Sequence, residues 1–165
     1  MDQYKRLLDI IAALRAPDGC PWDREQTHSS LKAACIEEAA EVVAGINIYE
    51  ETKDHSNLLE ELGDLLLQVV MHAQIASEAG LFDMEDVCRV VSDKMVRRHP
   101  HVFADADVES SDDVLKNWAE IKAKEHENQA ISQDVVNKML FEAFDESKEL
   151  IDVAAERKQA KLNKK

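Results

Sequence analysis

Apolar residues recur every three to four positions along most of the chain, a spacing that is typical of amphipathic helices. Segments with proline, glycine or many polar residues interrupt this pattern and would end a helix, as in "APDGCPWD" and "HPHVFADADVESS". Gly80 is the expected C-cap of the third helix, and Thr27, Ser29 or Ser30 is the expected N-cap of the second. The pattern predicts five helices, at about residues 4–15, 27–48, 58–79, 83–98 and 111–126.

The end of the chain differs from the rest after about Glu127. "ISQDVVNKMLFEAF" carries a weak apolar stripe, and "ERKQAKLNKK" is a charged end. We expect one further helix here, which packs on the body or on a partner and frays at its last residues. The predicted division is a main domain at residues 1–127 and a helical tail of unassigned role at residues 128–165.

The composition agrees with helices throughout. Ala, Leu, Glu, Lys and Gln dominate, and these residues favour helices. Only 4 Gly and 3 Pro occur among 165 residues, too few for a fold of many short strands and tight turns. We therefore predict an all-α fold, a helical bundle.

The charge and the cysteines narrow the class of protein further. A net charge of −14 repels the backbones of DNA and RNA. Three cysteines at irregular spacing fit reduced thiols better than a disulfide framework. The first residues contain no long apolar run. We expect a cytoplasmic protein with neither a nucleic acid nor a membrane as its partner.

Two of the predicted helices carry matching acidic motifs within apolar sequence. "CIEEAAEVVAGI" and "LLEELGDLLLQVV" each place two acidic residues side by side and a third one three positions later. Both motifs put carboxylates where a helix should bury apolar side chains. The residues are Glu37, Glu38 and Glu41 in the second helix, and Glu60, Glu61 and Asp64 in the third.

The helical period places these carboxylates close to the apolar faces. At about 100° per residue, Glu38 points into the apolar stripe of the second helix, and Glu41 lies roughly 60° to its side. In the third helix a polar track follows the edge of the apolar stripe. The residues of that stripe are Leu58, Leu62, Leu65 and Val69. The residues of the polar track are Glu61, Asp64, Gln68 and His72.

Half-buried carboxylates that lie close together need a cation, because burying an unpaired charge is costly. Either basic side chains or metal ions can supply it. Lys32 is the only Lys or Arg between Ser29 and Tyr49, and none occurs from Asn57 to Cys88. Oxygen-only ligands favour a hard ion, Mg²⁺ or Mn²⁺, and i, i+3 pairs on two facing helices can bring four carboxylates to it. The candidate metal ligands are Glu38, Glu41, Glu61 and Asp64.

Other interpretations of these motifs stay open. Charge runs in an acidic protein commonly mark solvated helix faces. A di-iron site would use Glu-x-x-His, but the third acidic residue occupies the place of the histidine in both motifs. His72, a lone histidine on a helix, is expected to be structural.

Basic and aromatic residues later in the chain suit a phosphate chain and a base. Lys94 and Arg98 are four positions apart and share a helix face, with Arg97 beside them. Trp118 and Lys122 have the same spacing, which would place an aromatic ring beside a cation. Arg97 and Arg98 also suit a helix C-terminus as dipole charges, and Trp118 also suits a core, so these alternatives stay open.

Several blocks of the sequence resemble the MazG family of nucleoside triphosphate pyrophosphohydrolases. They lie between about Leu7 and Glu125 and are "GCPWDREQTHSSL", "IEEAAEVVAGI", "EELGDLLLQVVMHAQIA", "GLFDMEDV", "DKMVRRHPHVFAD" and "NWAEIKAKE". The resemblance implies an all-α bundle completed by a second subunit, dependence on Mg²⁺, and hydrolysis of a (d)NTP to a (d)NMP and pyrophosphate in control of the nucleotide pool. Two antiparallel helical hairpins make a homodimer natural, with a dimer of dimers as the larger alternative.

The resemblance also implies roles for individual residues. The four candidate ligands would hold the metal, and Glu37 would be an additional acidic group beside it. In the mechanism that we expect from these residues, the metal together with Glu37 or Glu38 would activate the attacking water, while Lys94 and Arg98 would neutralise charge on the leaving group. The residues expected to contact the phosphates or the nucleotide are Lys94, Arg97, Arg98, Trp118 and Lys122.

Two other functional hypotheses stay open beside hydrolysis. A helical regulatory protein that senses nucleotide or metal without turnover would need the same acidic site. A structural helical module that dimerises through its apolar faces would not need it, and Mg²⁺ should then leave its melting temperature unchanged.

Overall fold

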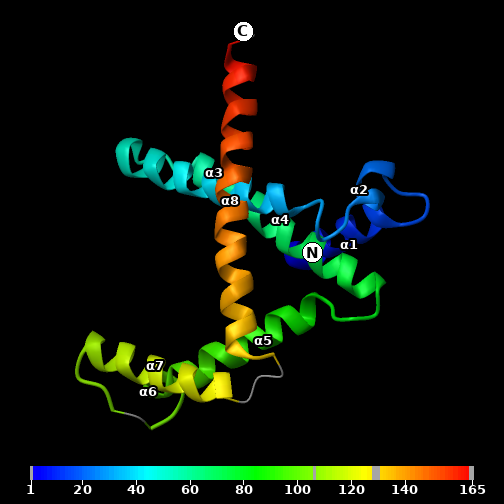
Figure 1. Cartoon of the computed structure of the whole chain (residues 1–165). Helices are drawn as coiled ribbons and strands as arrows, with labels where there is room; N and C mark the ends of the chain where they lie inside the picture. Colours follow the sequence, from blue (N-terminus) through cyan, green and yellow to red (C-terminus); the bar gives the residue numbers. More distant parts are fainter. Residues whose placement is uncertain (1, 106, 128–130, 164–165) are drawn as a thin grey trace. The chain divides into compact units, whose positions relative to one another are not determined.

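The structure is a computed structural model that describes residues 2–105, 107–127 and 131–163 (Figure 1). These residues form helices and no strand, which confirms the predicted all-α fold. The five predicted helices correspond to α1, α3, α4, α5 and α7, and the predicted tail helix is α8. The helices are α1 (Gln3–Arg15), α2 (Pro21–Glu25), α3 (Lys32–Thr52), α4 (Ser56–Glu78), α5 (Met84–Arg98), α6 (Pro100–Phe103), α7 (Ser111–Glu127) and α8 (Gln133–Leu162).

The sequence pattern misses two short helices, α2 and α6, in segments that it assigns to loops. Each begins at a proline, Pro21 in α2 and Pro100 in α6. Proline disrupts the interior of a helix but suits its first position, where the missing N–H has no partner to lose. Pro21 and Pro100, which lie in the segments that interrupt the longer helices, therefore begin short helices of their own.

The start of α3 also differs from the prediction. The N-cap of α3 is Leu31, without a side-chain hydrogen bond, so the prediction that Thr27, Ser29 or Ser30 caps this helix is wrong. The Thr27 N–H donates to Ser30 Oγ at 2.9 Å, and the Ser30 N–H donates to Thr27 Oγ1 at 3.1 Å. These two hydroxyls stabilise the turn that precedes the helix instead of its first turn.

Gly80, the predicted C-cap of α4, lies one residue beyond the C-cap, which is Ala79, and ends the helix. Its φ is +68°, in the left-handed region that glycine adopts without a steric penalty. The N–H groups of Gly80 and Leu81 donate to the carbonyls of Ser77 and Ala76, each at 3.0 Å. This pair of bonds is a Schellman motif, which satisfies carbonyls that the helix leaves free.

The chain divides into two compact units. The first unit contains Met1–Asp83 and Ala143–Lys165, and the second contains Met84–Glu142. The first therefore holds α1 to α4 and the C-terminal part of α8, and the second holds α5, α6, α7 and the beginning of α8. The division at residues 127 and 128 that the sequence predicts stays a prediction, and residues 128–130 lie outside the described residues.

The first unit is built around the close packing of α3 on α4. Gly45 of α3 is buried, and a Cβ atom there would lie 2.9 Å from Leu58 Cα and 3.2 Å from Asn57 Oδ1. The absence of a side chain at Gly45 lets the two backbones approach each other. This approach brings the two acidic motifs onto neighbouring helices.

The buried face of α4 is not the apolar stripe that the sequence predicts. Leu62 and Val69 of that stripe are 49% and 39% exposed, whereas Glu61 and Gln68 of the polar track are only 9% and 8% exposed. α4 is apolar on more than one face, so its period alone does not select the face that a single chain buries. The buried apolar residues of α4 are Val70, Met71, Ala73 and Ala76.

Arg15 fixes the segment that follows α1. Its side chain is buried, forms an ion pair with Glu78 at 2.7 Å and donates to the Gln26 carbonyl at 3.2 Å. The hydrogen bond from Arg15 lowers the pKa of Glu78. Arg15 thereby connects the end of α1 and the segment around α2 with the end of α4.

In the second unit, α5 packs on α6 and on α7. Among the helices that the structure describes, none is both long and apolar enough to cross a membrane.

Candidate metal centre

Three carboxylates from α3 and α4 converge in the first unit. Glu38, Glu61 and Asp64 each offer an oxygen atom, and these atoms lie within 4.8 Å of one another. Glu61 and Asp64 are three positions apart on α4 and therefore share a face, while Glu38 comes from α3. The acidic cluster, as we call these three residues, joins the two motifs that the sequence predicts to meet.

The acidic cluster concentrates negative charge, which the charge of Lys158 offsets only in part at Glu38. Burial raises the pKa of Glu38, and the charges of Asp64, Glu37 and Glu61 raise it further. In the part of the chain that the structure describes, no Lys, Arg or His forms an ion pair with a member of the cluster. Such an arrangement stabilises a bound cation, because the cation relieves the repulsion between the carboxylates.

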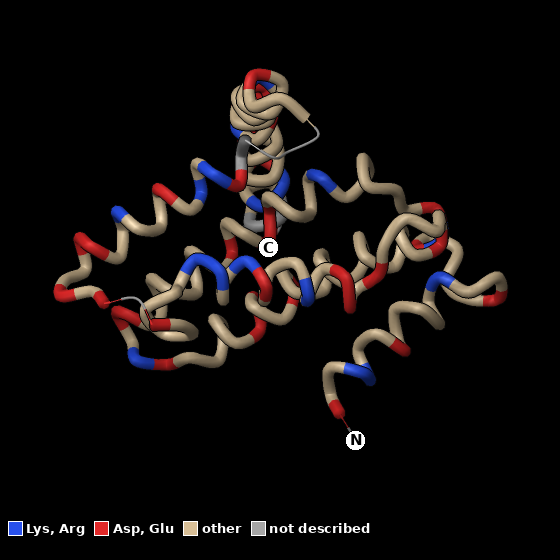
Figure 2. The backbone as a smooth tube through the Cα atoms, turned by 90° about the horizontal axis from the view of Figure 1, so that it is seen from below, with Lys and Arg blue, Asp and Glu red and all other residues tan. Residues whose placement is uncertain are grey.

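Acidic residues are also common elsewhere in the chain. Figure 2 shows Asp and Glu distributed along the helices, with Lys and Arg between them. The cluster is distinguished by convergence, because oxygens of three side chains from two helices meet there. An oxygen-only set of donors fits a hard divalent ion such as Mg²⁺ or Mn²⁺.

Glu61 is the most enclosed member of the acidic cluster. It is 9% exposed and accepts a hydrogen bond from Asn57 Nδ2 at 2.9 Å, one turn earlier in α4. Gln68, which follows Asp64 by one turn, is also buried, and no hydrogen-bond donor among the described residues reaches its Oε1. The polar side of α4 therefore faces the interior of the first unit.

Glu41, the fourth predicted ligand, lies outside the acidic cluster. Its carboxylate forms an ion pair with Lys158 of α8. Lys158 Nζ also lies 3.8 Å from Glu37 Oε1, and Arg157 Nη2 lies 3.4 Å from Glu37 Oε2. The assignment of Glu41 as a ligand stays a prediction.

The sequence analysis does not identify Arg157 and Lys158 as residues near the carboxylates. A signal was present, because the charged end "ERKQAKLNKK" gathers five cations in ten residues, whereas α3 contains one and α4 none. Within α3 and α4 alone, Lys and Arg are too few to pair with these carboxylates. Contacts between residues more than 110 positions apart are not visible in a local pattern.

The residues predicted to contact phosphates or nucleotide all lie in the second unit. Arg97 and Arg98 both pair with Glu125 of α7, at 3.1 and 2.6 Å. The guanidinium of Arg98 lies 5.2 Å from the ring centre of Trp118, a cation–π contact. The sequence places Lys122 beside Trp118, and the structure adds Arg98 over the ring.

Lys94 and Lys122 differ in exposure within this second unit. Lys94 is half-buried on α5, and Lys122 is exposed on α7. The His99 ring meets the Trp118 ring edge-on, with centres 4.9 Å apart. Trp118 is therefore partly a packing residue, and the roles of Lys94, Arg97, Arg98, Trp118 and Lys122 in binding stay predictions.

His72 has contacts that explain its presence on α4. Its ring stacks on the ring of His28, with Nδ1 atoms 2.7 Å apart, and its Nε2 lies 3.3 Å from Cys35 Sγ. Burial lowers the pKa of His72, and the neighbouring His28 lowers it further. Burial also raises the pKa of the Cys35 thiol. These contacts support the expected structural role of His72.

Comparison with known proteins places the acidic cluster in a described domain. The MazG nucleotide pyrophosphohydrolase domain matches residues 26–103, a range that includes the cluster and the cations of α5. A crystal structure of a mazG-related protein from Thermotoga maritima is similar, with a TM-score of 0.57 and 30% sequence identity, over 72% of this chain and 98% of that protein.

Two longer proteins are more similar in sequence. The uncharacterized protein YabN of Bacillus subtilis is 51% identical over 123 residues, which are 74% of this chain and 24% of YabN. A nucleoside triphosphate pyrophosphohydrolase of Escherichia coli strain K12 is 48% identical over 131 residues, which are 79% of this chain and 48% of that enzyme. The chain spans about half, or less, of the length of these relatives.

Proposed function

This chain belongs to the MazG family, and we propose that it is a Mg²⁺-dependent nucleoside triphosphate pyrophosphohydrolase. The reaction is the hydrolysis of a (d)NTP to a (d)NMP and pyrophosphate in the cytoplasm. The observation that carries the proposal is the convergence of Glu38, Glu61 and Asp64 from two packed helices. The activity named for the similar enzyme of Escherichia coli supports it.

The acidic cluster would hold the metal ion, and Glu41 would be the fourth ligand. The bound ion supplies positive charge that neutralises the phosphate chain and polarises its phosphoryl oxygens. Without such a charge, the carboxylates would repel the anionic triphosphate. Mn²⁺ offers the same preference for oxygen and would substitute for Mg²⁺.

A carboxylate beside the ligands would orient the attacking water and accept its proton. Glu37 lies next to Glu38 in sequence, and both charges belong to one interacting group. Glu37 or Glu38 would be this proton acceptor.

The cations of α5 would bind the phosphate chain. Lys94 and Arg98 would neutralise the charge that develops on the pyrophosphate leaving group, and Arg97 would add to this positive field. Arg97 and Arg98 now share Glu125, so a phosphate would replace a carboxylate as their partner. Trp118 and Lys122 would contact the nucleoside.

We propose a homodimer as the working assembly, with a dimer of dimers as the larger alternative. α3 and α4 leave a set of large apolar side chains exposed, which a second copy of the hairpin would cover. These residues are Val43, Ile46, Leu59, Leu62, Leu66 and Val69.

The reaction is tested by product analysis. Purified protein with Mg²⁺ and an NTP should release NMP and pyrophosphate in equal amounts, and Asp64→Asn or Glu41→Gln should abolish the release without unfolding the protein. Orthophosphate and NDP as products would contradict the reaction assignment. Bound NTP that stays intact for hours with Mg²⁺ present would indicate a sensor instead of an enzyme.

The metal dependence is tested separately. Excess chelator should stop the reaction, and Mg²⁺ or Mn²⁺ should restore it. Full activity in chelator would rule out the metal role of the acidic cluster. A screen of NTPs, dNTPs and damaged nucleotides with pyrophosphate detection then gives the preferred substrate.

A further inference from the structure

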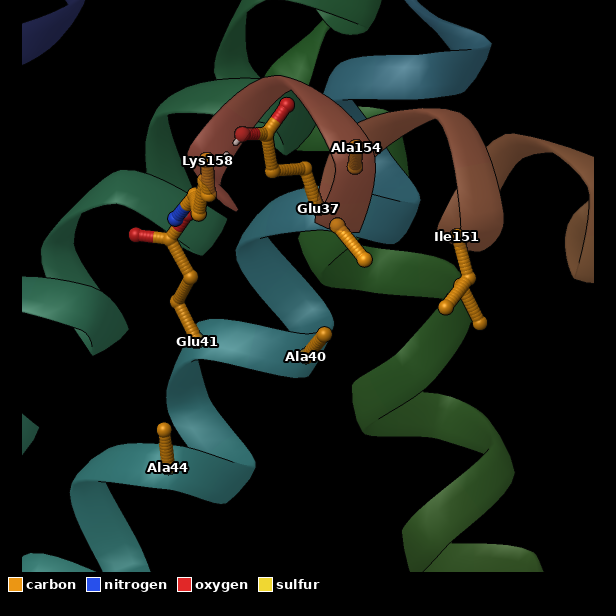
Figure 3. Close-up of a pocket in the computed structure, with 8 residues that line it drawn as sticks. Glu37, Ala40, Glu41, Ala44, Ile151, Ala154 and Lys158 are labelled. Carbon is orange, nitrogen blue, oxygen red and sulfur yellow. Dashed lines mark hydrogen bonds and ion pairs between the residues drawn. The ribbon is translucent and has the colours of Figure 1, made fainter. Parts of the chain in front are cut away.

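α8 brings two cations to the acidic side of α3. Lys158 pairs with Glu41, and Arg157 pairs with Glu37, as Figure 3 shows for Lys158 and the two glutamates. Glu37 adjoins Glu38 in sequence, and Glu41 follows Glu38 by three positions on the same helix. The two cations of α8 therefore neutralise the carboxylates of the motif that the acidic cluster does not use.

A third ion pair gives α8 a definite register on α3. Lys32 Nζ at the start of α3 lies 2.9 Å from Glu146 Oε1 of α8, so this pair has the opposite polarity to the other two. If α8 shifted along α3 so that Lys158 lay beside Lys32, or Glu146 beside Glu41, like charges would meet. The three pairs therefore select the position in which Lys158 reaches Glu41.

The apolar contact between α8 and α3 is small. Ala154 is the one residue of α8 that is buried among those whose side chains the structure describes. Beside it, a cavity of about 260 Å³ stays open between the two helices. It is lined mainly by small residues, with charged groups at its rim (Figure 3). The lining residues are Glu37, Ala40, Glu41, Ala44, Ile151, Ala154, Ala155 and Lys158.

Both cations are accessible to solvent. The side chains of Arg157 and Lys158 are 56% and 46% exposed, and exposed ion pairs contribute little to stability. α8 also lacks the broad packing that joins α3 to α4, as far as the described residues show. Together, the weak pairs and the open cavity describe a helix that can leave α3 without disrupting the α3–α4 core.

We propose that α8 is an exchangeable internal counter-ion of the metal site. Lys158 holds Glu41, the fourth predicted ligand, while the site contains no divalent ion. Docking of α8 and coordination of a metal ion by Glu41 then oppose each other, because an ammonium group and a divalent ion beside the same carboxylate repel each other. α8 competes with the metal ion and so sets the concentration at which the site fills. This proposal rests on the proposed metal site.

The test measures Mn²⁺ binding by the full chain without nucleotide, by electron paramagnetic resonance. Lys158→Ala should bind Mn²⁺ about two- to fivefold more tightly than the original chain, the range that an exposed ion pair can supply. Lys148→Ala is the matched control, because Lys148 lies on the same helix and pairs with Asp145 at 2.9 Å. The control removes the same charge and should leave the affinity unchanged.

Hydrogen exchange gives a second readout that does not depend on activity. Saturating Mn²⁺ should increase amide exchange in α8 from Ala143 onward if the helix leaves α3. Unchanged exchange in α8, or Mn²⁺ affinity in Lys158→Ala equal to that of the control, would overturn the proposal. Weaker NTP binding in Lys158→Ala with unchanged Mn²⁺ affinity would also overturn it and would assign Lys158 to the phosphates.

Failure of the proposed metal site can be distinguished from failure of the proposal for α8. Mn²⁺ binding that Asp64→Asn abolishes supports the acidic cluster, whatever Lys158→Ala does. If the original chain binds no Mn²⁺, the proposed metal site fails, and the proposal for α8 fails with it. Circular dichroism of each variant checks that the helices remain folded.

Discussion

The two units of the chain hold charged groups that are balanced in different ways. In the first unit, Glu38, Glu61 and Asp64 converge without an ion-pair partner among the described side chains. In the second unit, Arg97 and Arg98 share the carboxylate of Glu125. Among the described side chains, the carboxylates of the acidic cluster have no ion-pair partner, whereas Arg97 and Arg98 are already paired.

This difference shows what each region must do to bind a ligand. The acidic cluster gains a favourable interaction from any small cation, because its groups repel one another. The arginines must exchange the carboxylate of Glu125 for a phosphate. The net gain in binding free energy is therefore only the difference between these two interactions. Substitutions in the first unit should therefore have larger effects than substitutions in the second.

Removal of one charge from the acidic cluster should have the largest effect. Glu61→Gln keeps the shape of the side chain and deletes a buried ligand charge, so NTP hydrolysis should fall by about a hundredfold or more. Glu60→Gln is the control, because Glu60 is exposed and lies outside the cluster. Steady-state pyrophosphate release measures both variants, and an equal loss in the two would contradict the assignment.

Separation of α3 from α4 should disrupt the acidic cluster without altering a carboxylate. In Gly45→Ala the new Cβ would lie 2.9 Å from the backbone of Leu58, so the helices must move apart. We expect a decrease of about 1–3 kcal/mol in the free energy of unfolding, measured with urea, and weaker Mn²⁺ binding.

The matched control for this separation is Gly63→Ala. A Cβ at Gly63 of α4 would meet no atom within 4 Å, and alanine favours a helix over glycine. This variant should be as stable as the original chain or more so. A similar loss of stability in both variants would show that helix propensity, and not the approach of the two helices, determines the result.

Loss of a guanidinium in the second unit should have a smaller effect. Arg98→Ala should lower kcat/KM for an NTP by about ten- to a hundredfold, with Mn²⁺ binding unchanged. Arg89→Ala is the control, because Arg89 lies on the same helix and its side chain is 60% exposed. An unchanged kcat/KM in Arg98→Ala would restrict Arg98 to its structural contact with Glu125 and Trp118.

The pH dependence of stability should differ in sign between the two units, and this effect should be the smallest. Burial in the acidic cluster raises the pKa of Glu38, so this group stabilises the metal-free protein at low pH and loses that contribution as the pH rises through its folded-state pKa. The hydrogen bond from Arg98 lowers the pKa of Glu125, so its contribution is present above the ordinary glutamate range and is lost as the pH falls.

Urea unfolding in chelator measures both contributions. Glu38→Gln should become more stable relative to the original chain as the pH rises above the ordinary glutamate range. Glu125→Gln should be less stable at neutral pH and equal to the original chain in acid. The same sign for both variants would contradict the comparison between the units.

Much of the local structure follows from the sequence. The spacing of apolar residues locates α1, α3, α4, α5, α7 and α8, because the apolar period of a segment depends only on the residues of that segment. Gly80 marks the end of α4, because only glycine adopts its left-handed φ without strain. The acidic motifs indicate the helices that form the cluster, because i, i+3 spacing sets two carboxylates on one helix face.

Tertiary packing decided which of these groups meet. Within one chain, Glu61 and Gln68 are buried while Leu62 and Val69 stay exposed, because α4 has several apolar faces and its contact with α3 selects among them. Glu41 meets Lys158 across 117 positions of sequence. Helical periodicity is encoded by near neighbours, whereas the partner of a charged group depends on how distant helices pack.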